Sequence, residues 1–98
     1  MNYSVIGYDG TDDQALERRA AVRDQHLEMA NKLKAEGKVL YAVAMLNDSQ
    51  DMIGSVYIVN FETREELDKW LEVEPYVVGK VWEKIDIKVC KVAPAFLK

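Results

Sequence analysis

The chain contains one histidine, His26, and two arginines, Arg19 and Arg23, precede it at positions that share one face of a helix. An imidazole titrates near neutral pH and can take up or deliver a proton in a reaction. A guanidinium can bind a carboxylate through two parallel hydrogen bonds. These three residues therefore indicate a site that holds a small anion beside a proton-transfer group.

The segment that carries the three residues has an apolar side and a charged side. With about 100° of rotation per residue, Arg19, Arg23 and His26 fall within the apolar half of the helix. That half also contains Ala15, Leu16, Ala20, Val22, Leu27, Met29, Ala30 and Leu33. Because a buried polar group costs free energy unless it gains a partner, polar side chains on this side predict the wall of a pocket.

The hydrophobic pattern predicts one domain, residues 1–98, with the element order βαββαβ. The first helix is expected to be capped by Asp12 or Asp13 and to stop at Gly37, and Thr63 and Glu66 form a capping box for a second helix. We expect strands over 3–8, 39–46, 52–61 and 82–92, and helices over about 13–36, 63–73 and 75–79.

This order predicts an α+β, ferredoxin-like fold: an antiparallel sheet with both main helices on one face. The second and third strands are apolar on both alternating faces, although the helices cover only one of them. A second copy of the chain is the simplest cover for the open face, so we expect a homodimer with its sheets packed face to face. The alternative is a monomer with a partly apolar exposed sheet.

Composition excludes several other classes of function. The net charge is −4 and the chain has no basic run, which argues against nucleic-acid binding, and no stretch has the roughly 18 apolar residues that a membrane span requires. The single cysteine, Cys90, cannot form an internal disulfide, and the first residues lack the features of a secretory signal, so we expect a cytoplasmic protein. We expect no metal site and no cofactor, because neither ligand clusters nor a phosphate-binding loop occur.

An ordered set of short motifs resembles the YciI-like, or YCII-related, proteins. The motifs are Arg23-Asp24-Gln25-His26-Leu27, Glu36-Gly37-Lys38-Val39-Leu40, Gly54-Ser55, Glu74-Pro75-Tyr76-Val77 and Val81-Trp82-Glu83. The resemblance covers nearly the whole chain. It implies a ferredoxin-like fold that assembles into a dimeric α+β barrel, which agrees with the fold predicted from the residues.

The resemblance also implies an active site built from a histidine and an acidic residue. His26 matches the histidine of the family, and Glu74 matches the acid, where Glu replaces the more usual Asp. Arg23 matches the basic residue three positions before the histidine, and Ser55 the serine of a Gly-Ser pair. Related barrels act on small lactones and ring-cleavage products, including the dehalogenation of chlorinated lactones.

These residues suggest a cofactor-independent enzyme that abstracts a proton beside a carbonyl and then isomerises its substrate or eliminates a leaving group. In this reading His26 and Glu74 are catalytic, Arg19 and Arg23 bind a substrate carboxylate, and Ser55 or Tyr76 donates a hydrogen bond to a carbonyl or enolate. The alternative is a non-catalytic dimeric module that binds a small anionic metabolite or a protein partner.

Structural roles are the alternative for each of these residues. Arg19 could extend to solvent, Arg23 could pair with Glu74 or with a dimer mate, and Glu74 could cap the short helix at Pro75. Ser55 could mark a close approach of the backbone next to Gly54, and Tyr76 could be a core or dimer contact.

Overall fold

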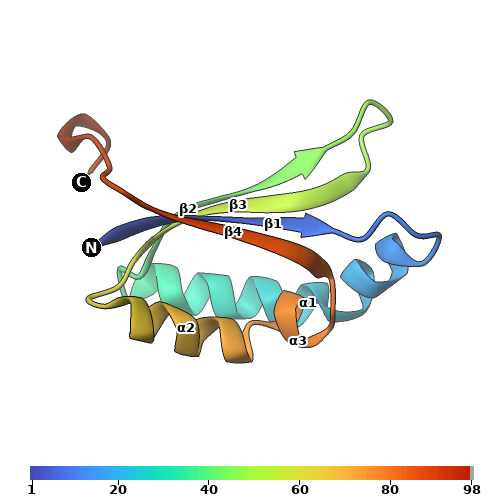
Figure 1. Cartoon of the computed structure of the whole chain (residues 1–98), viewed down its shortest axis with the longest axis horizontal. Helices are drawn as coiled ribbons and strands as arrows, with labels where there is room; N and C mark the ends of the chain where they lie inside the picture. The colour runs from blue at the N-terminus through green and yellow to red at the C-terminus, as the bar shows by residue number, and fades with distance from the viewer. Residues whose placement is uncertain (98) are drawn as a thin grey trace.

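Both main helices lie against one face of a four-stranded antiparallel sheet in the computed structural model, which describes residues 1–97 (Figure 1). The strand order is β2-β3-β1-β4, so the two central strands are the first and third in the chain. The elements are β1 (Asn2–Asp9), α1 (Ala15–Ala35), β2 (Val39–Leu46), β3 (Met52–Asn60), α2 (Arg64–Val73), α3 (Pro75–Val78), β4 (Trp82–Cys90) and the 3₁₀ turn η1 (Pro94–Phe96). The predicted α+β, ferredoxin-like βαββαβ order is confirmed.

Local signals set most of the helix ends. The Thr63 side chain accepts a hydrogen bond of 3.1 Å from the Glu66 backbone N–H, which confirms the predicted cap of α2. Gly37 ends α1 with φ of +77°, and the Lys38 N–H bonds back to the Leu33 carbonyl at 2.9 Å. This is the Schellman arrangement that a glycine allows.

The predicted start of α1 was too early. The helix begins at Ala15, and the preceding residue, Gln14, caps it without a side-chain hydrogen bond. The Asp12 carboxylate instead accepts from the Gln14 backbone N–H at 3.2 Å, within the turn that leads into the helix. Asp12 therefore lies two residues before the cap position, because a short Asp side chain can also bond the backbone two residues on.

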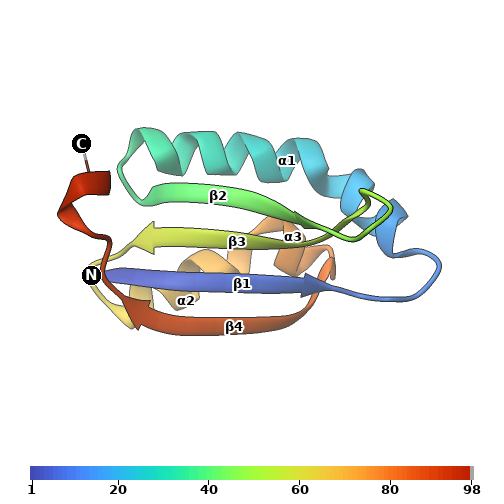
Figure 2. The same cartoon turned by 90° about the horizontal axis from the view of Figure 1, so that it is seen from above.

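Only a narrow stripe of α1 is covered by the rest of the chain. Arg19 and His26 are its buried residues, whereas Leu16 and Leu27, which the helical wheel placed on the apolar half, are 49% and 42% exposed. Figure 2 shows the reason: α1 runs alongside and beyond the edge strand β2, so the sheet covers only part of its inner side.

The core lies between the sheet and the helices and is rich in aromatic residues. It is formed by Tyr3, Val5, Val39, Tyr57, Val59, Phe61, Leu67, Trp70, Tyr76, Val81 and Trp82. Ser55 and Tyr57 alternate with open-face residues along β3, so both side chains point toward the helices. The core thus surrounds the polar residues that the sequence singled out.

The open face of β2 is uncovered in the single chain. This strand is at the edge of the sheet, and Tyr41 and Val43 are 48% and 59% exposed. Its register also shifts between Val39 and Tyr41, which is the signature of a bulge. After the bulge, Tyr41 and Val43 lie opposite open-face residues of β3, while Ala42 lies opposite Tyr57 on the helix side.

Within residues 1–97, no helix combines the length and the apolar character that crossing a membrane requires.

Candidate active site

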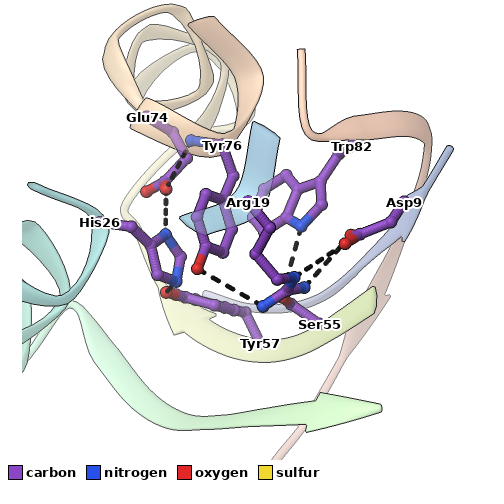
Figure 3. A network of polar contacts seen from close by, with 8 residues as sticks. All are labelled: Asp9, Arg19, His26, Ser55, Tyr57, Glu74, Tyr76 and Trp82. Atoms are coloured by element: carbon purple, nitrogen blue, oxygen red, sulfur yellow. Dashed lines mark hydrogen bonds and ion pairs between the residues drawn. The ribbon is translucent and has the colours of Figure 1, made fainter. Parts of the chain in front are cut away.

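His26 and Glu74 are in direct contact, as Figure 3 shows. His26 lies on α1, and Glu74 is the single extended residue between α2 and α3. The proline at 75 disfavours helical geometry at Glu74, whose φ and ψ are −63° and 122°, and this break directs the side chain inward. The Glu74 carboxylate pairs with Nδ1 of His26 and is 1% exposed, so the longer acid does reach the ring.

The same carboxylate also caps the short helix α3. Oε1 of Glu74, the atom that contacts His26, accepts a hydrogen bond of 3.2 Å from the Tyr76 backbone N–H. The two roles that the sequence left as alternatives, a partner for the imidazole and a helix cap, are therefore filled by one oxygen.

The second nitrogen of His26 is also engaged. Nε2 lies 2.9 Å from the hydroxyl of Tyr57, a residue of β3. Because an ionised carboxylate only accepts hydrogen bonds, Nδ1 carries the proton that it shares with Glu74. In a neutral imidazole Nε2 is then the acceptor, and the Tyr57 hydroxyl donates to it.

Tyr57 remains a phenol in this environment. Burial raises its pKa above the ordinary value, and the negative charge of Glu74 raises it further. Glu74, His26 and Tyr57 therefore form a chain of carboxylate, imidazole and phenol that ends at the surface of a pocket.

Aromatic packing fixes the imidazole plane. Tyr76 stacks on His26 with 3.6 Å between ring centroids and 6° between planes, and Trp82 meets the imidazole edge-on at 6.1 Å. Burial raises the pKa of Tyr76 as well, so its hydroxyl also keeps its proton. The packing holds the ring in the orientation that both of its hydrogen bonds require.

Arg19 is buried rather than extended to solvent. It is 5% exposed, and its Nε and Nη2 atoms donate to the two carboxylate oxygens of Asp9 at 2.7 and 3.2 Å. Nη2 also donates to Ser55 Oγ at 3.0 Å, and Nη1 to the Tyr76 hydroxyl at 3.4 Å. A buried carboxylate thus balances the Arg19 charge.

Arg23 differs from Arg19 in having an exposed side chain. It lines the same pocket, but it forms no ion pair with any residue in the range 1–97, and Glu74 is paired with His26 instead. Arg23 is therefore the cation of this region whose charge is available to a ligand.

A pocket of about 130 Å³ brings most of the predicted residues together. Its wall includes Arg19, Arg23, His26, Ser55 and Tyr76, and Tyr57 also contributes. Ala42 and Ala44 of β2, which pair with Tyr57 and Ser55 of β3, add small side chains to the pocket lining. Cavities of about 150 Å³ hold a benzene ring, so this pocket suits one small ring or a short organic acid.

Two larger surface hollows, of about 490 and 650 Å³, lie elsewhere on the molecule. Neither includes His26 or Ser55, so chemistry rather than size singles out the smaller pocket. Residues 1–97 contain no group of three or more histidine, cysteine or acidic side chains placed to hold a metal ion.

Three functional neighbours were missed from the sequence: Asp9, Tyr57 and Trp82. Asp9 lies just after the predicted first strand and was assigned no role, whereas it is a buried residue whose carboxylate accepts hydrogen bonds from Arg19. The alternation of β3 could have identified Tyr57, because it places this residue on the same face as Ser55. No sequence signal connected Trp82 to Ser55.

Comparison with known proteins is consistent with this arrangement of elements. A model of the YCII-related domain matches residues 1–91. The chain belongs to the YCII-related family. This membership confirms the resemblance in the sequence motifs.

Two curated relatives extend over nearly the whole YCII-related chain. Protein YciI of Escherichia coli O6:H1 is 35% identical over 97 residues, which cover 93% of this chain and 97% of that protein. A protein of Haemophilus influenzae is 34% identical over the same length and the same shares of both chains.

Solved structures with low sequence identity share the YCII-related fold. One is 5-chloro-2-hydroxyhydroquinone dehydrochlorinase from Burkholderia phenoliruptrix, described in complex with 2,5-dihydroxybenzoquinone, with a TM-score of 0.81, 22% identity and coverage of 97% of this chain and 98% of that one. Another is a protein of Agrobacterium tumefaciens, with a TM-score of 0.54, 14% identity and coverage of 96% and 95%. At these identities the likeness establishes the fold.

Proposed function

We propose that the protein is a cofactor-independent enzyme in which His26 and Glu74 perform acid/base chemistry on a small lactone or carboxylate. The reaction is an isomerisation or the elimination of a leaving group, including dehalogenation. One observation carries the proposal: a buried histidine is bonded to a carboxylate on one nitrogen and to a pocket-lining phenol on the other. This arrangement orients the ring, sets its tautomer and stabilises an imidazolium.

The hydrogen bond between Tyr57 and His26 supports one path for the proton. As the substrate C–H bond breaks, its proton passes to the Tyr57 oxygen while the Tyr57 proton passes to Nε2 of His26. The product of this step is an imidazolium paired with Glu74, and Tyr57 remains neutral throughout. The electron pair of the C–H bond forms an enolate, which either takes the proton back at another carbon or expels a leaving group.

The pocket also indicates the kind of substrate. The exposed guanidinium of Arg23 lies at its wall and suits a carboxylate or another anionic oxygen. The apolar side chains of Leu27 and Ala42 and the ring of Tyr76 suit the carbon skeleton of one small ring.

The dehydrochlorinase that shares this fold supports the elimination branch. Loss of HCl from a ring begins with the removal of a proton next to a carbon that carries a leaving group, which is the step that the His26 pair is proposed to perform. We therefore include chlorinated hydroxy-aromatic compounds among the test substrates, together with small lactones.

Replacement of His26 tests the function. Turnover of a panel of these compounds is measured by NMR and by chloride release, first with the unchanged protein. For any compound that turns over, we expect His26→Ala to lower kcat by about 10²- to 10⁴-fold, as for other general acid/base residues. Gln25→Ala, on the exposed side of the same helix turn, is the matched control. Equal turnover by His26→Ala and the control would contradict the proposal.

A second function is favoured by one feature of the site. Both nitrogens of His26 are already bonded within the protein, as in a purely structural histidine. The protein would then be a non-catalytic module that binds a small anionic metabolite or a protein partner through Arg23. NMR titration with small carboxylates separates the two functions: binding that shifts Arg23 but leaves the His26 ring signals unchanged, without turnover, supports the module.

We also propose that the protein functions as a homodimer in the cytoplasm. Exposed Tyr41 and Val43 on the open sheet face would gain most from a second sheet packed against them. The single free cysteine, Cys90, suits a reducing compartment.

A further inference from the structure

We propose that Ser55 and Tyr76 form a paired hydroxyl site that binds the oxyanion developing on the substrate, and that Arg19 is the positioning residue for both. This inference rests on the proposed acid/base function of the same pocket and assigns a role to each of these three residues. It also revises the sequence-based assignment of Arg19 as a direct ligand for the substrate.

The hydrogen bonds of Arg19 leave it no donor for a ligand. A guanidinium has five N–H groups and no acceptor. Nε and Nη2 bond the Asp9 carboxylate, and Nη2 also bonds Ser55 Oγ. Nη1 donates to the Tyr76 hydroxyl at 3.4 Å and to the Met52 sulfur at 3.8 Å. With each N–H occupied and the charge balanced by Asp9, Arg19 acts on the pocket through the groups that it holds.

The direction of the Ser55 hydroxyl follows from its two donors. Ser55 Oγ receives hydrogen bonds from Arg19 Nη2 at 3.0 Å and from the Trp82 indole N–H at 3.3 Å. Guanidinium and indole N–H groups only donate, so both lone pairs of Oγ are occupied. The Ser55 O–H can therefore act only as a donor. Among residues 1–97 it has no protein acceptor, and Ser55 lines the pocket.

Tyr76 is constrained in the same way. Its oxygen accepts from Arg19 Nη1, its ring is stacked on His26, and the Arg19 guanidinium lies 4.7 Å from its ring centroid. Its hydroxyl donates to no other residue in the range 1–97. Burial keeps this hydroxyl protonated by raising its pKa. The Tyr76 O–H is therefore a second donor at the pocket wall.

The two donors lie where negative charge would appear. The nitrogens Nη1 and Nη2 of one guanidinium hold the two oxygens, so both hydroxyls lie at the same end of Arg19, as Figure 3 shows. Hydrogen bonds from a cation polarise both O–H groups and strengthen them as donors. When the Tyr57–His26 pair removes a proton beside a carbonyl, the carbonyl oxygen gains charge, and fixed donors lower the energy of that state.

The test uses 4-nitrophenol, an aromatic alcohol whose absorption spectrum distinguishes phenol from phenolate and which does not react. Donors that favour an oxyanion lower the pKa of the bound phenol, so a spectrophotometric pH titration in the presence of saturating protein measures the site directly. We expect the bound pKa to lie about one unit or more below its value in water.

Three variants assign the shift to the proposed donors. We expect Ser55→Ala and Tyr76→Phe each to reduce the stabilisation of the phenolate by about tenfold. We expect Arg19→Lys to reduce it further, although Arg19 does not touch the probe, because lysine lacks the fork that holds both oxygens. The matched controls Ser4→Ala, Tyr41→Phe and Arg18→Lys change the same residue types outside the pocket and should leave the bound pKa unchanged.

The outcomes separate this inference from the proposed function. If the pKa of the bound phenol is unchanged in both Ser55→Ala and Tyr76→Phe, the hydroxyl site is overturned, even if Arg19→Lys fails to fold. If the pKa shift is lost only in Arg23→Met, the bound anion is held by Arg23 instead. Failure of the unchanged protein to bind the phenolate at millimolar concentration would also overturn the hydroxyl site. The pKa of the bound phenol could shift in a way that depends on Ser55 and Tyr76 while no test compound turns over. This result would support the hydroxyl site and contradict only the acid/base function.

Discussion

At the scale of single residues, the site is a set of polar groups whose hydrogen-bonding capacity is almost fully used. Glu74, His26 and Tyr57 form one chain, and Asp9, Arg19 and Ser55 form another. Tyr76 joins them, because it stacks on His26 and accepts from Arg19. Such satisfied networks are rigid, since a change in one member leaves a buried partner unpaired.

Replacement of the Glu74 carboxylate by an amide tests its charge. Glu74→Gln keeps the size of the side chain and an oxygen that can cap α3, but it removes the negative charge that stabilises an imidazolium. We expect kcat to fall by about 10²- to 10⁴-fold, while the midpoint of urea denaturation changes little. Glu72→Gln, an exposed neighbour on α2, is the control. A kcat equal to that of the control would show that the Glu74 charge takes no part in the reaction.

The buried phenol of Tyr57 predicts a loss of stability at high pH. Its pKa is raised above the value of about 10 that an unfolded tyrosine has, so the folded chain keeps a proton that the unfolded chain loses above that pH. Its contribution to the free energy of unfolding is constant below about pH 10 and falls as the pH rises further. Urea denaturation at about pH 8 and about pH 11 measures this loss.

Tyr57→Phe removes the ionising hydroxyl and should make stability less dependent on pH over that interval. Tyr8→Phe serves as its control, because Tyr8 is 39% exposed. A decline of the same size in Tyr57→Phe and in the unchanged protein would assign the loss to other groups.

At the scale of elements, the sequence predicted the local structure well and the long-range contacts poorly. The order of strands and helices, the Thr63 cap and the break before Pro75 follow from patterns within a few residues of each other. The contact of His26 with Glu74 came from family resemblance, because 48 residues separate them and helix periodicity holds no information at that distance.

The remaining errors have the same physical origin. Burial on α1 depends on where the sheet ends, so a helical wheel could not show that Leu27 is exposed. The bulge after Val39 depends on pairing with β3, and strict alternation along β2 overlooked it. Asp9 and Trp82 lie at the site because β1 and β4 are neighbours in the sheet, and the sequence alone did not show this pairing.

The pairing of β1 also makes a prediction for Gly7. A Cβ atom at this position would overlap the indole of Trp82, the ring that donates to Ser55. Alanine usually stabilises a strand relative to glycine, but here we expect Gly7→Ala to lower the free energy of unfolding by about 1–3 kcal/mol through overpacking. Urea denaturation followed by tryptophan fluorescence measures the stability, and the emission of the folded protein reports on the two buried indoles, Trp70 and Trp82.

Ser4→Ala, in the same strand but on the open face of the sheet, is the control for Gly7→Ala. A Gly7→Ala protein as stable as this control would mean that the indole moves aside at no cost. The bond from Trp82 to Ser55 would then contribute little to the geometry of the pocket.

At the scale of the whole molecule, the layers are asymmetric. The helices cover one side of the sheet, and the other side remains open (Figure 1). Stable protein interfaces bury about 800 Å² on each partner, which is the area that one face of a small sheet can provide. The apolar residues of β2 and the neighbouring strand β3 provide the centre of such a contact, and Lys84, Asp86 and Lys88 of β4 could form its polar rim.

A charge on the open face should separate the proposed dimer. Val43 is 59% exposed in the single chain, so Val43→Glu costs the fold little but places a charge in the interface. We expect light scattering after gel filtration to show a dimer for the unchanged protein and a monomer for Val43→Glu. Val73→Glu on α2, at 58% exposure, is the control. A monomeric unchanged protein would refute the assembly.

Because one oxygen of Glu74 serves both the imidazole of His26 and the backbone N–H of Tyr76, the two hydrogen bonds compete for it. When the ring takes up a proton, its charge draws that oxygen closer and weakens the bond to the amide. The Tyr76 amide proton is therefore a spectroscopic reporter of the ring: its chemical shift should follow the same titration curve as His26. Proton uptake during binding or turnover can thus be followed from the backbone, without observing the imidazole.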